Sequence, residues 1–246
     1  MLNLNIPSPI TKISSNFLDK KSINIFIKRD DLIHNVVSGN KWRKLKYNLQ
    51  QARKNGYNSV LSFGGAYSNH LHALSFAANQ MNFNSIGVIR GDKCEKMNQT
   101  LSFCKDKNMR FHYLDRSTYR NSKYSRDVLI TLQNLFGDFY MIPEGGNNLF
   151  GVQGCEEILK EVNIDFDYIL CSVGTGCTAA GLIKSIRSSQ QFLGFSPFKK
   201  VEEQKKNIFN YCNSHLTNWD ILADYHFGGF NKFNDNLIKF IRQFYL

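Results

Sequence analysis

No stretch of the sequence approaches the roughly eighteen consecutive apolar residues that a membrane-spanning helix needs. The amino terminus, which reads MLNLNIP, has no basic region followed by an apolar core. A secretory signal peptide would need both features. These absences predict a cytoplasmic protein that does not bind membranes.

Cysteine is scarce and scattered. The chain has six cysteines, none of them in a C-x-x-C pair, and no histidine lies beside them at the spacing of a zinc site. The sequence therefore predicts neither a metal site nor a disulfide framework. We expect Cys155 and Cys171, in a predicted helix and a predicted strand, to be buried thiols.

Acidic residues are also few, with 20 Asp and Glu against 31 Lys and Arg and a net charge of +11. A charge of this sign attracts nucleic acid in some proteins. Here the basic residues are dispersed in short clusters such as Lys199-Lys200, and no nucleic-acid-binding motif is present. We therefore expect no nucleic-acid partner. The charge instead favours an anionic cofactor and substrate.

Apolar strands alternate with amphipathic helices from Asn58 onward, without a repeat or a linker. The predicted strands span 59–63, 85–90, 109–114, 139–142, 168–173, 192–195 and 219–223. The predicted helices span 69–79, 95–107, 125–136, 151–162, 177–188, 200–212 and 234–244. This alternation predicts an α/β protein with mostly parallel sheets covered by helices on both faces.

Three glycine-containing turns follow predicted strands, at Gly64-Gly65, Glu144-Gly145-Gly146 and Gly174-Thr175-Gly176. Ligands of parallel α/β proteins gather at the carboxyl ends of strands. We therefore expect the functional site to draw on all three turns.

Lys41 is the first candidate, within Ser38-Gly39-Asn40-Lys41-Trp42 at a predicted helix start. An isolated lysine is usually a solvated surface side chain. The Gly39-Asn40 turn and the apolar residues that follow favour an inward-facing amine instead. A partly desolvated amine is a good nucleophile toward a carbonyl and can form a Schiff base.

The segment Gly64 to His70 is the second candidate. Ser68 or Asn69 fits the cap of the following helix, which is a purely structural role. A helix start also leaves backbone N–H groups for an anion such as a substrate carboxylate. Both side chains would point into such a site.

The turn from Gly174 to Thr178 is the third candidate. Glycines let the backbone close around a phosphate, to which the hydroxyls of Thr175 and Thr178 can add hydrogen bonds. Ala179 stands where a dinucleotide-binding fingerprint would have its third glycine, and no acidic residue follows at the required distance. A Walker A lysine is absent as well. The turn therefore predicts a phosphate site of another kind.

The chain resembles the 1-aminocyclopropane-1-carboxylate deaminase/D-cysteine desulfhydrase family. The segments that carry the resemblance, in matching order and spacing, are KRDDL at 28–32, SGNKWRKL at 38–45, GGAYSNH at 64–70, PEGGN at 143–147 and GTGCT at 174–178. The resemblance implies two three-layer α/β/α domains of the tryptophan synthase β-subunit type, the type II fold of pyridoxal-phosphate enzymes. It implies a large cofactor-binding domain of 1–45 plus 146–246, and a small inserted domain of 46–145.

The resemblance also implies the roles of individual residues and a homodimer. Lys41 would carry pyridoxal 5'-phosphate and act as the main base. Ser68 would hold the carboxylate of a small amino-acid substrate, beside His70, and Asn69 would bond the phenolic oxygen of the cofactor and border the substrate. The residues expected to bind the cofactor phosphate are Lys44, Gly174, Thr175, Gly176, Cys177 and Thr178.

The chain departs from the family in two places. Phe230 aligns with an active-site tyrosine that is implicated in opening the cyclopropane ring, unless a slip of the alignment makes Tyr225 the substitute. The chain also stops at Leu246, where the family continues for some tens of residues. This predicts a fragment, a frameshifted product or a complete but reduced protein.

These features predict a pyridoxal-phosphate lyase that performs β-elimination on D-cysteine, because elimination does not need the missing tyrosine. Two alternatives stay open at this point. One is a 1-aminocyclopropane-1-carboxylate deaminase. The other is a truncated, inactive relative that only binds the cofactor.

Overall fold

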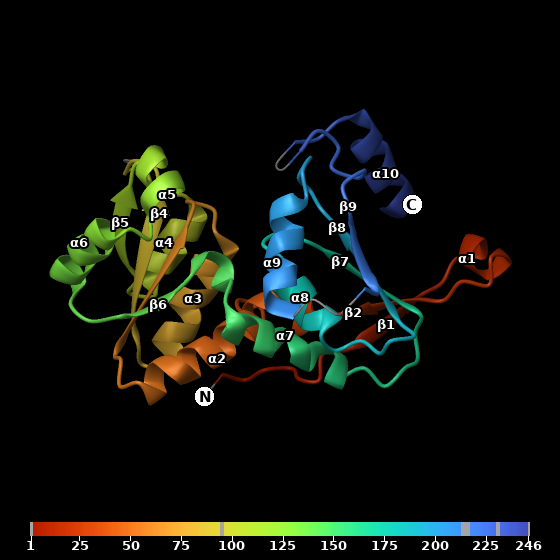
Figure 1. Ribbon diagram of the computed structural model, residues 1–246, viewed down its shortest axis with the longest axis horizontal. Helices are drawn as coiled ribbons and strands as arrows, with labels where there is room; N and C mark the ends of the chain where they lie inside the picture. Colours follow the sequence, from red (N-terminus) through yellow and green to blue (C-terminus); the bar gives the residue numbers. More distant parts are fainter. Residues whose placement is uncertain (1, 94–95, 213–216, 230–231, 246) are drawn as a thin grey trace. The chain divides into compact units, whose positions relative to one another are not determined.

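Two sets of parallel strands organise the chain in the computed structural model, which describes residues 2–93, 96–212, 217–229 and 232–245 (Figure 1). Backbone contacts divide the chain into two compact units, Met1–Gly154 and Cys155–Leu246. We call them the first and second unit and describe each by itself. The discontinuous division into 1–45 plus 146–246 and 46–145 stays a prediction.

The sheet of the first unit has four parallel strands in the order β5-β4-β3-β6. Their bounds are Ser59–Gly64 for β3, Asn84–Arg90 for β4, Arg110–Leu114 for β5 and Tyr140–Ile142 for β6. In the register, Leu61 of β3 lies opposite Ile86 of β4 and Met141 of β6. Four parallel strands place the turns after each strand at one edge of the sheet.

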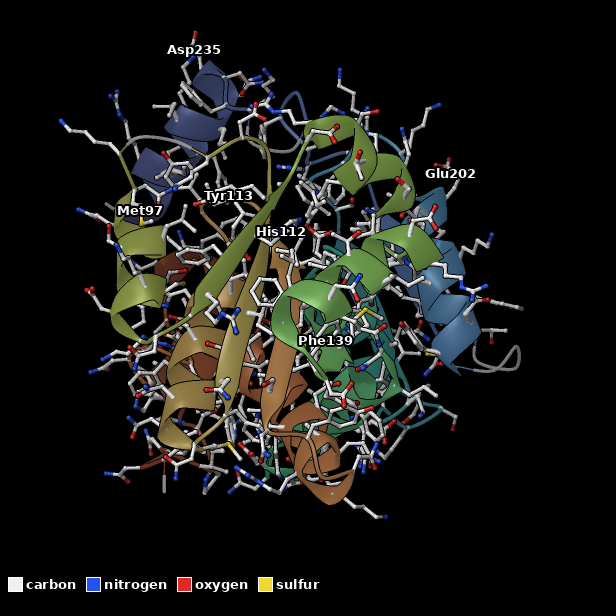
Figure 2. The ribbon with its side chains drawn as sticks, turned by 90° about the vertical axis from the view of Figure 1, so that its left-hand side faces the viewer. Met97, His112, Tyr113, Phe139, Glu202 and Asp235 are labelled. Atoms are coloured by element: carbon white, nitrogen blue, oxygen red, sulfur yellow. The ribbon has the colours of Figure 1, made fainter. Side chains whose placement is uncertain are left out.

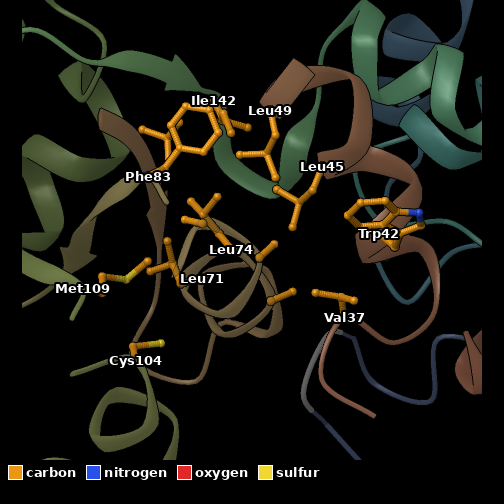
Figure 3. Packing of buried hydrophobic residues seen from close by; sticks show 14 of the residues in the cluster. Val37, Trp42, Leu45, Leu49, Leu71, Leu74, Phe83, Cys104, Met109 and Ile142 are labelled. Carbon is orange, nitrogen blue, oxygen red and sulfur yellow. The ribbon is translucent and has the colours of Figure 1, made fainter. Parts of the chain in front are cut away.

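The two faces of this sheet pack against separate hydrophobic clusters, because side chains alternate along each strand. Val60 and Ile89 pack with α2 (Asn40–Lys54), α3 (Asn69–Gln80) and α4 (Gln99–Asp106), in the cluster that Figure 3 shows. Leu61 and Val88 pack with α5 (Arg116–Ser122) and α6 (Arg126–Phe136) on the other face. Because side chains alternate along a strand, the apolar runs predicted from the sequence bury both faces.

The edge strand β5 shows the same division. Figure 2 labels His112 and Tyr113, which are neighbours on this strand. Tyr113 packs against the first cluster, whereas the imidazole of His112 lies edge-on to Phe136 of α6 with ring centroids 6.4 Å apart. An edge strand of a parallel sheet is thus still covered on both faces.

Side-chain caps set where several helices begin. Ser68, Asn98 and Ser125 each accept a hydrogen bond from the backbone N–H three residues later. The cap at Asn98 explains why α4 begins at Gln99, later than the predicted start at 95. Asp115 caps the short helix α5, which the sequence analysis did not predict.

Short elements at the amino terminus were also not predicted. Strands β1 (Ile10–Ile13) and β2 (Ile25–Lys28) pair antiparallel, with α1 (Asn16–Lys20) between them. A one-turn 3-10 helix, η1 (Asp30–Leu32), follows. Segments of four residues carry too little periodicity to be recognised from the sequence.

The second unit contains a three-stranded parallel sheet in the order β7-β8-β9. The strands span Tyr168–Ser172, Gln191–Phe195 and Trp219–Leu222. The helices of this part of the chain are α7 (Leu149–Lys160), α8 (Cys177–Ile183), α9 (Glu202–Cys212) and α10 (Asp235–Tyr245). The predicted mixed α/β fold with parallel sheets is confirmed.

Strand β7 differs from its prediction as a strand buried on both faces. Tyr168 is 59% exposed and Leu170 is 57% exposed. Cys171 is only partly buried, so its prediction as a core thiol is wrong, whereas Cys155 is buried as expected. β7 is the edge strand of its sheet and pairs only with β8 among the described residues, which leaves these side chains less covered.

Helix α8 is shorter than predicted, because it ends at Ile183 and Lys184 forms its cap. No helix in the described parts of the chain combines the length and the apolarity that a membrane crossing requires.

Candidate active site

Lys41 lies in the first turn of α2. The helix is preceded by Gly39, whose φ of 61° and ψ of −144° belong to a region that residues with a side chain rarely adopt. The Lys41 side chain is half-buried, and its Nζ donates a hydrogen bond to Asn40 Oδ1 at 2.7 Å. The amine is therefore held at the start of the helix by its own neighbour.

A buried ion pair fixes this helix start. The Arg43 side chain is fully buried and donates to Asp30, with Nε 3.2 Å from Oδ2 and Nη2 3.1 Å from Oδ1. The backbone carbonyl of Asp30 accepts a hydrogen bond from Gly39 N at 2.9 Å. Asp30 thus holds the turn before Lys41 and the helix after it. The sequence analysis used this segment only for its resemblance and missed its positioning role.

Helix α7 packs directly on the same part of α2. A Cβ atom added to Gly154 would lie 1.8 Å from the carbonyl oxygen of Arg43, far inside any permitted contact. Asn48 and Asn148 exchange two amide hydrogen bonds, of 3.1 and 2.7 Å, between α2 and the start of α7. Close backbone packing and paired amides together restrict the position of α2.

The turn between β3 and α3 brings Gly64 and Ser68 into contact. A Cβ atom on Gly64 would lie 2.6 Å from Ser68 Oγ, so only glycine fits there. Ser68 Oγ accepts the Leu71 N–H at 3.2 Å and caps α3, as the structural interpretation predicts. Asn69, the first residue of the helix, is exposed.

His70 is buried beneath this turn, with 3% of its surface exposed. Its Nε2 lies 3.0 Å from Ser62 Oγ, and Ser62 Oγ in turn donates to the Pro143 carbonyl at 3.4 Å. This donation leaves Ser62 Oγ to accept from Nε2–H, so we assign the proton to Nε2 and a lone pair to Nδ1. Nδ1 is buried and has no hydrogen-bond partner among the described residues.

Burial, followed by the charges of Lys41 and Lys44, lowers the pKa of His70 to about 3. The imidazole is consequently neutral at physiological pH. The charges of Lys41 and Lys44 on α2 thus act on His70, although its ring contacts Ser62 of β3.

Lys44 and His70 meet at the turn after β6, in the 3-10 helix η2 (Glu144–Gly146). Gly146 has a φ of 67°, and a Cβ atom there would lie 2.9 Å from Lys44 Cβ and 3.5 Å from His70 Cε1. Lys44 is 6% exposed. The first unit therefore brings together Lys44, His70 and the PEGGN segment, all of which the sequence singled out.

The second unit contains the predicted phosphate turn. Gly176 caps α8 with a φ of 92° and no side-chain hydrogen bond, unlike the capped helices of the first unit. A Cβ atom on it would lie 3.2 Å from Ile208 Cγ1 and 3.3 Å from the Gln204 carbonyl of α9. Asn207 of α9 also donates to the Thr175 carbonyl at 3.1 Å. Helix α9 thus shapes the turn and requires glycine at this position.

This turn fits a phosphorylated cofactor. The first amides of a helix have no carbonyl partner within the helix, and the N-cap residue of α8, Gly176, has no side chain that could cap them. A phosphate oxygen is a suitable acceptor for such amides. The side chains of Cys177 and Thr178 follow in the same turn, buried and half-buried respectively.

Comparison with known proteins identifies the family. The sequence profile of the family described as pyridoxal-phosphate dependent enzymes matches residues 2–197. This chain belongs to that family. The predicted cofactor, pyridoxal phosphate, and the predicted enzyme class are therefore confirmed.

Two curated relatives show which members of the family this chain is similar to. A protein of Thermotoga maritima, named provisionally as a 1-aminocyclopropane-1-carboxylate deaminase, is 33% identical over 73% of this chain and 59% of its own length. A mitochondrial protein of Arabidopsis thaliana, named as a bifunctional D-cysteine desulfhydrase/1-aminocyclopropane-1-carboxylate deaminase, is 28% identical over 72% of this chain and 48% of its own. The chain thus matches less than two thirds of the length of either relative.

A solved structure supports the same assignment. A protein described as a homologue of 1-aminocyclopropane-1-carboxylate deaminase superposes with a TM-score of 0.78 and 26% identity, over 96% of this chain and 76% of its own. The type II fold of pyridoxal-phosphate enzymes, expected from the sequence motifs, is confirmed by this match.

The predicted site residues fall into three groups. Lys41, Lys44, Ser68, Asn69 and His70 lie in the first unit, and the turn from Gly174 to Thr178 lies in the second. Phe230 lies outside the described residues. The joint site of both units stays a prediction.

Proposed function

We propose that this enzyme is a lyase that performs β-elimination on a small amino acid, of the D-cysteine desulfhydrase type. The overall reaction converts D-cysteine and water to pyruvate, ammonia and hydrogen sulfide. The observation that carries the proposal is the Lys41 amine, fixed at the start of α2 by Asn40 and by the Asp30–Arg43 brace. The name of the Arabidopsis relative supports the substrate.

Lys41 is proposed to hold the cofactor and to move the substrate proton. Pyridoxal phosphate, when bound, withdraws electrons from the substrate α-carbon and so makes its proton removable. After the substrate amine has replaced it on the cofactor, Lys41 Nζ would be free to take that proton, which lets the β-substituent leave with its electron pair. Hydrogen bonding to Asn40 Oδ1 orients the amine.

Ser68 and Asn69 are proposed to orient the amino-acid substrate. Ser68 Oγ accepts the Leu71 N–H, so its own hydrogen is directed to another acceptor. A substrate carboxylate provides one, and the first amides of α3 attract the same negative charge. Asn69 is exposed at this helix start and is assigned to the phenolic oxygen of the cofactor.

The cofactor phosphate is assigned to Lys44 and to the turn Gly174–Thr178, including Thr175, Gly176 and Cys177. The glycine N-cap of α8, Gly176, supports the assignment of the turn, because it leaves space for a phosphate close to the backbone. A homodimer and a cytoplasmic location remain predictions from the sequence.

Deamination of 1-aminocyclopropane-1-carboxylate is the second candidate, because the Thermotoga relative and the solved homologue are named for it. This substrate has no α-proton, so ring opening needs a further nucleophile or acid. Phe230 offers neither. Tyr225 would be the substitute, and its ring is 58% exposed and edge-on to Phe195 at 5.5 Å.

The test begins with a visible absorption spectrum of the purified protein with added pyridoxal phosphate, before and after borohydride reduction. We expect peptide mapping to place the reduced cofactor on Lys41. Modification of Lys44 or of scattered surface lysines instead would refute the site. Pyruvate release from D-cysteine is then measured beside 2-oxobutanoate release from the cyclopropane amino acid.

Each outcome of the product assay has a distinct meaning. Pyruvate release alone supports the proposal, and faster 2-oxobutanoate release favours the deaminase. Specific labelling of Lys41 without either product would identify an inactive relative that only binds the cofactor.

A further inference from the structure

A basic pocket opens at the carboxyl edge of the first unit's sheet. It has a volume of about 930 Å³, within the range of small-molecule sites. Arg90 at the end of β4, Arg116 and Arg120 of α5, and Glu144 after β6 contribute to its lining. None of these residues has a role in the proposed elimination.

The pocket has an excess of positive charge. Lys123 pairs with Glu144 at 2.9 Å, which neutralises the only carboxylate of the lining. Arg90, Arg116 and Arg120 have no salt bridge to any described residue. Three guanidinium groups therefore line one cavity without a counter-charge from the described chain.

The nearest acidic residue along the chain does not supply this counter-charge. Asp115 directs Oδ1 at the backbone of α5, where it accepts from Ser117 N at 2.9 Å and Thr118 N at 3.0 Å. A hydrogen bond from the Thr118 side chain, followed by these backbone hydrogen bonds, lowers the pKa of the Asp115 carboxyl and keeps it in its capping role. Its absence from the pocket lining agrees with this role.

A buried tyrosine ring contributes to the lining of the pocket. Tyr119 is 2% exposed, and its ring lies edge-on to Phe63 of β3 at 6.3 Å. The Lys123 ammonium lies 4.8 Å and the Arg90 guanidinium 6.0 Å from the centre of the same ring. A buried aromatic ring thus anchors two of the cations, which reduces the entropy that a ligand must remove on binding.

Like charges that share a cavity repel each other, and a bound anion relieves this repulsion. Guanidinium groups match phosphate and carboxylate groups with paired hydrogen bonds. We propose that this pocket binds a small molecule through a phosphate or carboxylate group, held by Arg90, Arg116 and Arg120. Gly65, Ala66 and Tyr67 also line the pocket, so it adjoins the turn that carries Ser68. The three arginines have no role in the proposed reaction, and the proposal does not depend on that reaction.

The test is calorimetric titration of inorganic phosphate into the protein saturated with pyridoxal phosphate, in a chloride buffer. Malonate forms a second arm that distinguishes carboxylate from phosphate ligands. We expect one ion to bind per chain, and the double variant Arg116→Gln/Arg120→Gln to bind at least about tenfold more weakly. Both arginines are exposed, so these variants should fold.

Arg126→Gln is the matched control, because Arg126 is exposed on the neighbouring α6 and does not line the pocket. It should bind phosphate and malonate like the wild type. Tighter phosphate binding indicates a phosphorylated ligand, and tighter malonate binding a carboxylate ligand.

Three results would overturn the proposal. These are no binding of either ion, equal binding by the double variant and the wild type, and binding by the cofactor-free protein that cofactor saturation abolishes. The last would assign the pocket to the cofactor. Calorimetry detects binding without turnover, so an inactive enzyme would refute the proposed function and leave this result intact.

Discussion

Acid should destabilise the first unit through one side chain, His70. Its pKa is lowered to about 3 by burial and then by the charges of Lys41 and Lys44, against an ordinary value of 6.5. Between these two values the unfolded chain binds a proton at this position and the folded chain does not. The free energy of unfolding therefore falls as the pH falls through this window, and above it His70 contributes no pH dependence.

The magnitude follows from the difference between the two pKa values. Each unit corresponds to about 1.4 kcal/mol, so the full difference amounts to about 5 kcal/mol. At about pH 5 the unfolded state is almost fully protonated and the folded state is neutral, which costs about 2 kcal/mol relative to about pH 8.

Urea unfolding of the cofactor-free protein, followed by circular dichroism at these two pH values, measures the effect. His70→Gln removes the titrating group and keeps a polar side chain, so its stability should depend on pH by about 2 kcal/mol less than that of the wild type. His72→Gln is the comparison, because His72 lies on the same helix, is only partly buried and stacks on Phe103. Burial lowers the pKa of His72 as well, so this variant should lose a smaller part of the pH dependence than His70→Gln.

The same pH dependence in His70→Gln and the wild type would refute the reasoning. It would mean that His70 is charged in the folded state, through water or an anion at Nδ1. If His72→Gln lost the pH dependence and His70→Gln kept it, His72 and not His70 would be the group that causes the effect.

Three further predictions concern Lys41 and the packing around it. Lys41→Ala should abolish turnover at any cofactor concentration. Lys44→Ala should instead raise the cofactor concentration needed for half-maximal activity. Equal rescue of both variants by excess cofactor would contradict this division of roles. Asp30→Ala removes the carboxylate that pairs with the buried Arg43 guanidinium and should lower the free energy of unfolding by about 3–5 kcal/mol in urea titrations. A loss below about 1 kcal/mol would show that the pair does not brace α2. Gly154→Ala places a methyl group against the Arg43 carbonyl and should cost about 3 kcal/mol by the same assay in the cofactor-free protein, with Gly174→Ala, where an added Cβ atom meets open space, as the comparison. An unchanged midpoint for Gly154→Ala would contradict the close packing of α7 on α2.

The sequence by itself determined the strands and most of the helices from β3 onward and pointed to the cofactor. Apolar runs ending in glycine identify β3 and β7, and the Ser68 cap identifies the start of α3, because both signals depend on local backbone geometry. The motif around Lys41 identifies the cofactor because the amine and its turn are adjacent in the chain.

Only the tertiary structure decided which distant residues support that site. Asp30 and Arg43 pair across thirteen positions, and Ser62 meets His70 through the packing of α3 on β3. Their partners depend on how elements pack, which no local pattern specifies. The basic pocket arises in the same way, since Arg90 and Arg116 follow different strands and converge only because parallel strands end at one edge of the sheet.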